Sequence, residues 1–159
     1  MRPMRVRDID LLWAWRHIPE VITYLPSTPR PLAWEHHEEW FLQAMMGQGT
    51  NRLDRIAVLG DVDTGRIVAH VHAADLQSGK GVPEIGVVVG AVDLWHKGIG
   101  THAVRYLIAL LKERQYPACV ALIHPANHTS RLMFERLGFV DTGETGRADQ
   151  IIYRKELTS

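Results

Sequence analysis

The chain has 159 residues, of which 46% are hydrophobic and 23% are charged, a balance typical of a globular domain with its own core. Lysine plus arginine and aspartate plus glutamate number 18 each, so no net charge favours nucleic acid or a membrane as partner. One cysteine excludes an internal disulfide, and no apolar run reaches the ~18 residues that span a bilayer. These features, with an N-terminus unlike a signal peptide, predict a cytoplasmic protein.

The N-terminal third is predicted to be mainly helical. Asp8 or Asp10 suits the N-cap of a first helix that carries Trp15, and Pro19 suits the first turn of the next helix. Apolar residues at helical spacing indicate a third helix. The expected order is a strand at Met4–Arg7, the helix around Trp15, and helices at Pro19–Tyr24 and Trp34–Met46.

Strands and two longer helices are predicted to follow. The valine-rich segment that begins at Glu84 is typical of a strand buried on both faces. The expected strands are Arg55–Gly60, Arg66–Ala74, Glu84–Gly90, Ala118–Ile123, Phe139–Thr142 and Gln150–Leu157. The expected helices are Gly98–Gln115, which Pro117 ends, and one from Asn127 or Thr129 to a glycine C-cap at Gly138.

Two glycines stand where the first long helix is predicted to begin. Gly98 and Gly100 have no side chain to shield their backbone N–H groups, and the N-terminus of a helix favours negative charge. Lys97 adds a positive charge there. The segment predicts a phosphate or pyrophosphate ligand, although a tight turn capped by glycines explains the same pattern. It is not a P-loop, because no Gly-Lys-Ser/Thr closes it.

Three segments resemble the GNAT family of N-acetyltransferases. They are Pro83–Gly90, Trp95–Thr101 and Asn127–Phe139. Two further segments, Leu12–Val21 and His37–Phe41, are similar to the branch that holds ribosomal-protein N-terminal and amino-sugar acetyltransferases. The resemblance implies an α/β fold in which residues 1–159 form one acetyltransferase domain. Its mixed sheet of six to seven strands, flanked by helices, would splay between the fourth and fifth strands.

The resemblance also implies acetyl-CoA as the acyl donor, bound in that split without a metal. Three groups of residues are expected to contact it. The backbone of Val88, Val89 and Gly90 would meet the pantetheine and thioester, and the Asn127 side chain would meet the pantetheine arm. The pyrophosphate would lie against His96, Lys97, Gly98, Ile99, Gly100 and Thr101. Asn127 also suits a plain helix cap, and both roles are compatible.

Two positions depart from the family pattern. Many members carry a tyrosine as general acid seven residues after this asparagine, and here that residue is Phe134. Members that acetylate ribosomal-protein N-termini can carry a glutamate base near the end of the fifth strand, where this chain has Leu122. The catalytic residues therefore have to be argued locally.

Three side chains are candidates for proton transfer. Glu84 begins the strand expected to splay, where a carboxylate can accept the amine proton. The alternative is a charged residue at the end of a strand with no role in catalysis. His72 shares one face of its strand with His70, and His124 follows the fifth strand. A structural histidine is the alternative for each, and no third ligand has a spacing diagnostic of metal.

The acceptor is predicted to be the amine of a small molecule, with an amino sugar or sugar nucleotide preferred. Because the N-terminal helices line the acceptor site in the family, Trp34, Trp40 and Tyr24 are candidates for substrate contact, with core packing as the alternative. Two other functions stay open, which are protein N-terminal acetylation and acyl-CoA binding with reduced catalysis. The expected state is a monomer or homodimer.

Overall fold

The computed structural model describes residues 1–25, 33–46, 51–61, 63–75 and 82–158. The helical elements are η1 (Val6–Asp8), α1 (Ile9–Trp15), α2 (Pro19–Ile22), α3 (Trp34–Met46), η2 (Val92–Leu94), α4 (Ile99–Glu113), α5 (His128–Arg136) and η3 (Arg147–Asp149). The strands are β1 (Arg2–Pro3), β2 (Asn51–Asp61), β3 (Arg66–Asp75), β4 (Glu84–Val89), β5 (Ala118–Ile123), β6 (Val140–Thr145) and β7 (Ile151–Glu156).

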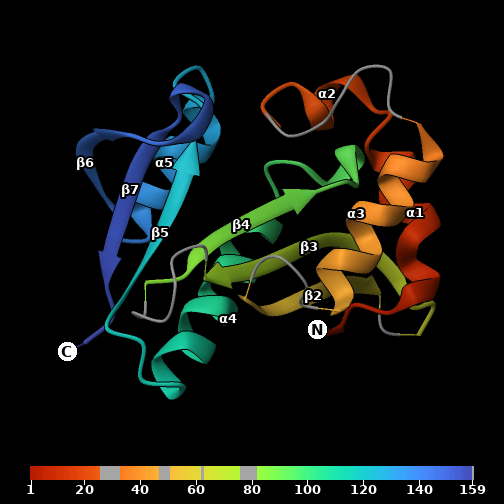
Figure 1. The fold of residues 1–159 in the computed structure, drawn as a ribbon, viewed down its shortest axis with the longest axis horizontal. Helices are drawn as coiled ribbons and strands as arrows, with labels where there is room; N and C mark the ends of the chain where they lie inside the picture. Colours follow the sequence, from red (N-terminus) through yellow and green to blue (C-terminus); the bar gives the residue numbers. More distant parts are fainter. Residues whose placement is uncertain (26–32, 47–50, 62, 76–81, 159) are drawn as a thin grey trace.

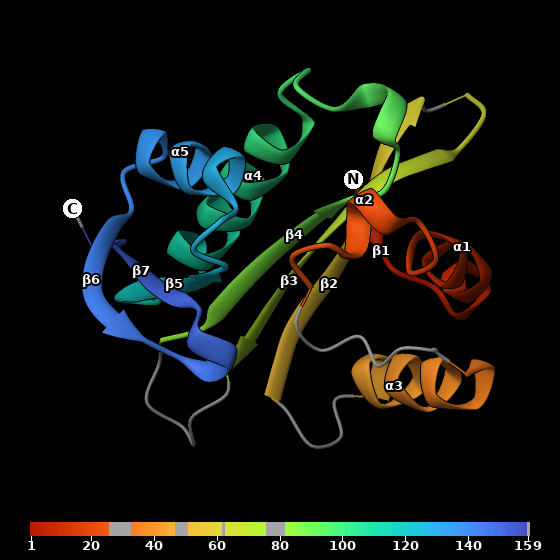
Figure 2. The same cartoon turned by 90° about the horizontal axis from the view of Figure 1, so that it is seen from above.

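In the described part of the chain, seven strands form one mixed sheet in the order β1-β2-β3-β4-β5-β7-β6. Neighbouring strands are antiparallel except β4 and β5, which are parallel. Figure 2 shows α4 and α5 on one side of the sheet, with α1 and α3 on the other. The predicted α/β fold with a mixed sheet flanked by helices is confirmed.

The parallel pair β4 and β5 is splayed. Only one pair of residues, Glu84 and Val120, is in register between these strands, at the start of β4. From there the two strands diverge toward their C-terminal ends, as Figure 1 shows. The predicted opening between the fourth and fifth strands is therefore present.

Each face of the sheet has its own apolar core. On the α4 side, Val104, Leu107 and Leu111 recur at helical spacing and are almost completely buried. Replacing Leu107 by alanine is expected to destabilise the fold by about 2–5 kcal/mol. On the α1 and α3 side, a second cluster contains Leu12, Trp15 and Phe41.

The valine strand connects the two cores. Val87 and Val89 pack against the cluster under α4, whereas Val88 packs against the cluster under α1 and α3. Alternate residues of a strand point to opposite faces, so β4 is covered from both sides, which is what its continuous apolar sequence predicts.

The N-terminus departs from the prediction. The strand expected at Met4–Arg7 is wrong, because β1 spans Arg2–Pro3 and residues 6–8 form a 3-10 turn. Asp8 explains the difference, since its carboxylate accepts hydrogen bonds from Arg5 N (2.8 Å) and from both terminal nitrogens of Arg2 (2.8 and 2.7 Å). The side chain closes this turn instead of capping α1.

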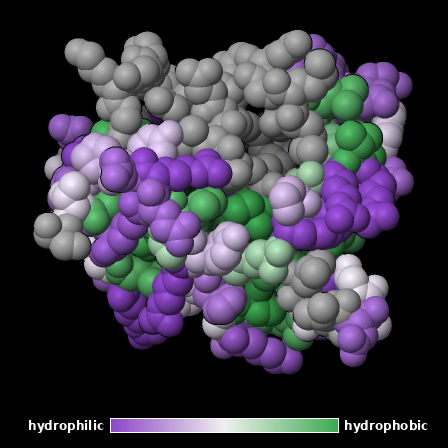
Figure 3. Space-filling model, turned by 90° about the horizontal axis from the view of Figure 1, so that it is seen from below, coloured by the Kyte–Doolittle hydropathy of each residue, from purple (hydrophilic) through white to green (hydrophobic). Residues whose placement is uncertain are grey.

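The other predicted elements are present, with ends that differ by a few residues. Trp34–Met46 and Ala118–Ile123 have the predicted bounds, and β2 begins at Asn51 instead of Arg55. Among the described residues, no helix is long and apolar enough to cross a membrane. Figure 3 shows that hydrophilic residues cover most of the described surface on its face of the molecule.

Candidate active site

Backbone groups line the opening between β4 and β5. Val120 N donates to Pro83 O at 3.0 Å, so the backbone groups of these two residues face the neighbouring strand. Because these groups alternate sides along a strand, those of Leu122 on β5 and of Val87 and Val89 on β4 also face the opening. Beyond the Glu84–Val120 pair the strands diverge and no further residues of the two are in register, so these backbone groups are the ones with which an extended ligand would pair.

Two of the carbonyl groups that face the opening are met by side chains. The indole Nε1 of Trp95 donates to Val89 O at 2.9 Å, and Gln150 Nε2 donates to Leu122 O at 3.4 Å. After β4 the chain forms a bulge against β3, because Gly90 N and Ala91 N both donate to Val68 O. At Val89, the N–H is therefore the group left to contact a ligand.

The first turn of α4 lies beside the end of β4. A β-carbon on Gly100 would lie 3.6 Å from Val89 Cγ2 and 3.2 Å from Met133 Sδ of α5. Gly98 occupies the N-cap with φ +80°, a conformation that glycine adopts without strain, and no side chain of the described residues caps the helix there. His96, also left-handed, and Lys97 are exposed just before it. This helix start can bind an anion through its free N–H groups.

The start of α5 is built differently. Asn127 is the N-cap, and its Oδ1 accepts from Ser130 N at 3.1 Å. Asn127 therefore caps the helix, which is one of the two roles expected for it. Because Oδ1 is used in the cap, Nδ2 is the group that would contact pantetheine. The side chain of Met133, in the second turn of α5, lies beside Gly100 in the first turn of α4.

Two of the three candidate catalytic residues share one face of the sheet. Register pairs His70 with Val88, His72 with Gly86 and Ala74 with Glu84, so His72 and Glu84 lie diagonally across two strands. The His72 ring lies directly over Gly86, where a β-carbon would be 2.4 Å from Cε1. Glycine at position 86 thus gives the imidazole its place on the face of the sheet that carries α1 and α3.

Glu84 is held by an arginine that the sequence did not point to. Arg147 of η3 donates to both carboxylate oxygens, at 2.7 and 2.5 Å. The Glu84 side chain is 12% exposed and that of Arg147 is 53% exposed. These hydrogen bonds raise the pKa of the Arg147 guanidinium above its ordinary value. If Glu84 accepted a proton from a substrate, its hydrogen bonds with Arg147 would have to break or weaken.

The third candidate, His124, lies on the β5 side of the opening. Its Nδ1 accepts from Ala126 N at 3.1 Å, and its carbonyl oxygen accepts from Asn127 N at 2.9 Å. The ring of Tyr24, which follows α2, lies 5.3 Å from the imidazole between centroids. The structure therefore brings a predicted substrate contact and a predicted catalytic residue together, from segments far apart in the sequence.

The other two predicted substrate contacts belong to an aromatic layer between α1 and α3. Trp34 meets Trp13 edge to face at 5.2 Å, and Trp40 stacks under the Arg16 guanidinium at 4.3 Å. Both indoles surround the fully buried His37, each 5.7 Å away. This layer gives the tryptophans packing partners, and their contact with substrate stays a prediction.

The position of His37 on the predicted helix Trp34–Met46 favoured a solvated side chain, and this expectation is wrong because the side chain is buried in this layer. His37 Nε2 donates to Ile9 O at 3.0 Å, and its Nδ1 lies 3.3 Å from Arg16 Nη1. Burial lowers the pKa of the imidazole, so His37 is neutral in the folded chain at neutral pH. It ties α3 to α1, and its position on an amphipathic helix was the only signal in the sequence.

Two further side chains are removed from the chemistry by burial. Phe134 is 3% exposed and meets Phe139 edge to face at 5.0 Å, so it belongs to the core under α4. Cys119 is fully buried, and this burial raises the pKa of its thiol to about 12. A thiol with such a pKa is not a nucleophile at neutral pH.

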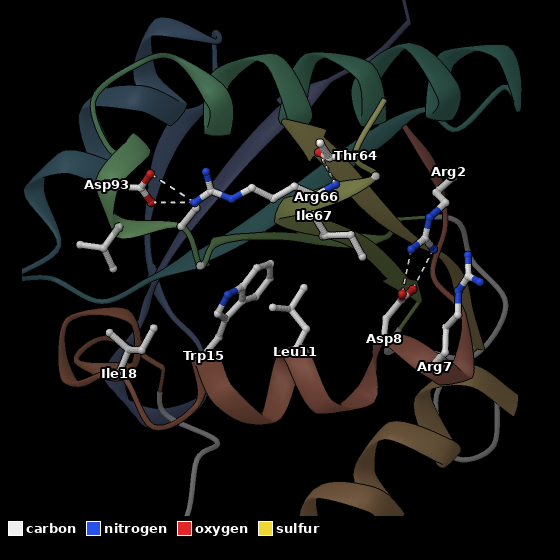
Figure 4. A pocket seen from close by; sticks show the side chains of 14 residues that line it. Arg2, Arg7, Asp8, Leu11, Trp15, Ile18, Thr64, Arg66, Ile67 and Asp93 are labelled. Carbon is white, nitrogen blue, oxygen red and sulfur yellow. Dashed lines mark hydrogen bonds and ion pairs between the residues drawn. The ribbon is translucent and has the colours of Figure 1, made fainter. Parts of the chain in front are cut away.

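A separate groove of about 710 Å³ lies between α1 and the turn that joins β2 to β3. Figure 4 shows Trp15 and Leu11 of α1 facing Ile67, with the Arg66–Asp93 and Arg2–Asp8 ion pairs nearby. Of the residues predicted to bind acetyl-CoA, only Gly90 lines it. Trp15 packs so tightly on Gly90 that a β-carbon there would lie 1.8 Å from the indole.

Comparison with known proteins decides the family. The model of the acetyltransferase (GNAT) domain matches residues 1–140. The chain belongs to the GNAT family.

Relatives of this GNAT domain include an uncharacterized protein of Methanocaldococcus jannaschii, 34% identical over 99% of this chain. The chain spans only 31% of that relative. A crystal structure of a domain from the same organism has 33% identity and a TM-score of 0.84, covering 98% of this chain and 96% of that one.

A more distant fold neighbour is the spermidine N-acetyltransferase of Vibrio cholerae, solved in complex with CoA and spermine. It has 13% identity and a TM-score of 0.77, and the alignment covers 96% of this chain and 90% of that one. At this identity the likeness shows the fold alone. The match to the family model confirms the resemblance to the GNAT family found in the sequence.

Proposed function

We propose that residues 1–159 form a single domain that transfers the acetyl group of acetyl-CoA to the amine of a small acceptor. The observation that carries the proposal is the opening between β4 and β5, with the uncapped first turn of α4 beside it. A pantetheine chain needs backbone partners along an extended path, and a pyrophosphate needs free N–H groups. The described residues offer both.

The residues around the opening fit this donor. The N–H of Val89 faces the opening, and the N–H of the next residue, Gly90, donates to Val68 O of β3. Glycines at positions 98 and 100 leave the start of α4 open to a phosphate, and Lys97 adds a positive charge. We assign the pyrophosphate to His96–Thr101, and the pantetheine to the Val89 N–H and the Asn127 side chain, because the backbone groups of Val88 and the N–H of Gly90 are directed toward β3. Acetyl-CoA supplies an activated acyl group, and no metal is required.

The acceptor amine enters from the face that carries α1 and α3. His72 and Glu84 lie on this face, and Arg147 adds a half-exposed guanidinium. Polar groups of both signs suit an acceptor rich in hydroxyl groups, so an amino sugar or sugar nucleotide is our preferred class. The fold neighbour from V. cholerae was solved with spermine, which makes a polyamine a second small amine to test.

The proposal is tested by release of free CoA from acetyl-CoA in the presence of a panel of amines. The panel contains amino sugars, sugar nucleotides, aminoglycosides, polyamines, amino acids and short peptides with free N-termini. We expect turnover with a small amine. Turnover with peptides alone would instead indicate protein N-terminal acetylation, and failure to bind CoA would refute the assignment of His96–Thr101.

A second candidate function is acyl-CoA binding with reduced catalysis. Two observations favour this function. Phe134 is buried in the core, and Glu84 is held by Arg147. Tight CoA binding without turnover over the whole panel would support this function. A fall in turnover for Glu84→Gln, with unchanged CoA affinity, would argue for catalysis. Light scattering on the same samples distinguishes the expected monomer from a homodimer.

A further inference from the structure

The hydrogen bonds around His124 determine where its ring carries a proton. Ala126 N donates to Nδ1 at 3.1 Å, so this nitrogen offers its lone pair and carries no hydrogen. In a neutral imidazole with an unprotonated Nδ1, the proton resides on Nε2. His124 therefore has a hydrogen-bond donor at Nε2, and in this geometry Nε2 has no lone pair with which to accept a proton. As placed, the side chain is a donor and not a general base.

The turn that carries His124 holds the imidazole in one orientation. Its carbonyl oxygen accepts from Asn127 N at 2.9 Å, and Asn127 then caps α5 through Ser130 N. The half-buried Tyr24 ring lies against the imidazole at 5.3 Å. A donor that is already oriented loses little entropy when it meets a developing charge, which is the condition for useful electrostatic stabilisation.

The proposed reaction needs such a donor on this side of the opening. Breaking the C–S bond leaves an electron pair on sulfur, and Phe134 has no proton to give and lies in the core. A thiol has a pKa near 8.5, so the departing thiolate is only a weak base at neutral pH. A hydrogen bond to the sulfur is then sufficient, and full proton transfer in the same step is not required.

We infer that His124, as the neutral Nε2–H tautomer, donates a hydrogen bond to the thioester sulfur as it departs. This inference rests on the proposed function. The amine nitrogen attacks the carbonyl carbon and forms the C–N bond, the C–S bond breaks, and its electron pair stays on sulfur. The proton lost by the amine nitrogen leaves through solvent and ends on the thiolate, which gives the N-acetyl product and free CoA. His124 begins and ends the cycle in the same protonation state.

The kinetic test compares His124→Ala with His124→Gln, because glutamine keeps an N–H donor at about the position of Nε2. A hydrogen bond to a charged group predicts that kcat falls by about 10- to 100-fold in the alanine variant. We expect the KM for acetyl-CoA to change by less than about 3-fold, and the glutamine variant to recover most of kcat. His128→Gln on the exposed first turn of α5 is the matched control and is expected to behave as wild type.

Three outcomes of the kinetic test overturn the inference. They are an alanine variant with normal kcat, a glutamine variant as slow as the alanine variant while both remain folded, and a loss that appears only in KM. If the wild-type chain turns over no amine at all, the proposed function fails instead, and a measurement without turnover decides the inference.

That measurement is NMR of the imidazole nitrogens of ¹⁵N-histidine-labelled protein, with His124→Gln used to assign the signals. The expected result is a protonated Nε2 and an unprotonated Nδ1 at neutral pH, with the Nε2–H signal shifting when CoA is added. A proton on Nδ1, or a His124 signal that does not respond to bound CoA, overturns the inference. Either answer is independent of whether an acceptor has been found.

Discussion

Two helices begin beside the opening in the sheet, and their first turns are completed in opposite ways. In α5, Asn127 Oδ1 accepts from Ser130 N, so a side chain satisfies one of the unpaired N–H groups. In α4, the N-cap is Gly98, and no side chain of the described residues takes this role. A helix start that the protein caps itself has a structural role, whereas one without a side-chain cap keeps N–H groups with which an anion can pair, which is the role we propose for α4.

The largest expected effect comes from placing a carboxylate in the open helix start. Thr101 is the third residue of α4, and Thr101→Glu adds a negative charge where the pyrophosphate is assigned. The same charge interacts favourably with the helix dipole, so the free energy of unfolding is expected to stay level or rise by about 0.3–1 kcal/mol. CoA binding is expected to weaken by at least about 10-fold. Calorimetric titration and urea unfolding measure the two effects separately.

The matched control is Ser130→Glu, at the same position of α5. It adds the same charge to a helix start that is already capped, so stability is expected to respond as in Thr101→Glu while CoA affinity changes by less than about 2-fold. If Thr101→Glu bound CoA as tightly as wild type, the pyrophosphate would not lie at α4. If both variants weakened binding equally, the contrast between the two helices would be wrong.

The next effect separates the two roles assigned to Asn127. Asn127→Ala removes the cap and is expected to lower the free energy of unfolding by about 1 kcal/mol. Asn127→Ser retains a capping oxygen but lacks the amide, so it is expected to recover the stability. If the Nδ2 group contacts pantetheine, both variants weaken CoA binding by the same few-fold factor. Recovery of binding in the serine variant would show that the residue only caps the helix.

Local patterns predicted most of the elements and both helix starts. Three of these patterns depend only on residues close together in the chain, so a short segment of sequence is enough to predict the structure. They are the valine run of β4, the glycines before α4 and Asn127 before α5. The strand at Met4–Arg7 failed because the side chain of Asp8 bonds backwards to Arg2 and Arg5. These three hydrogen bonds outweigh the strand tendency of a segment of only four residues.

The surroundings of the site were not predictable in the same way. Arg147 and Glu84 are separated by 63 residues, and nothing in either segment indicates that η3 folds onto the start of β4. The packing of Trp15 on Gly90 likewise depends on how α1 lies on the sheet. The sequence identified Glu84 as a candidate base but not the guanidinium that occupies both of its oxygens, because that pairing is a property of the tertiary fold.

The smallest expected effect concerns Lys97, whose charge adds to the open start of α4. Its side chain is exposed, so Lys97→Gln is expected to weaken CoA binding by only about 2- to 5-fold at low salt. The Debye length falls from about 10 Å at 0.1 M to about 3 Å at 1 M, and the difference between variant and wild type is expected to shrink over that range. Lys112→Gln, at the far end of the same helix, is the matched control and should leave binding unchanged at every salt concentration. A Lys97→Gln effect that persists at high salt would mean that the ammonium contacts the ligand directly, and the open helix start would then carry less of the binding than the backbone geometry implies.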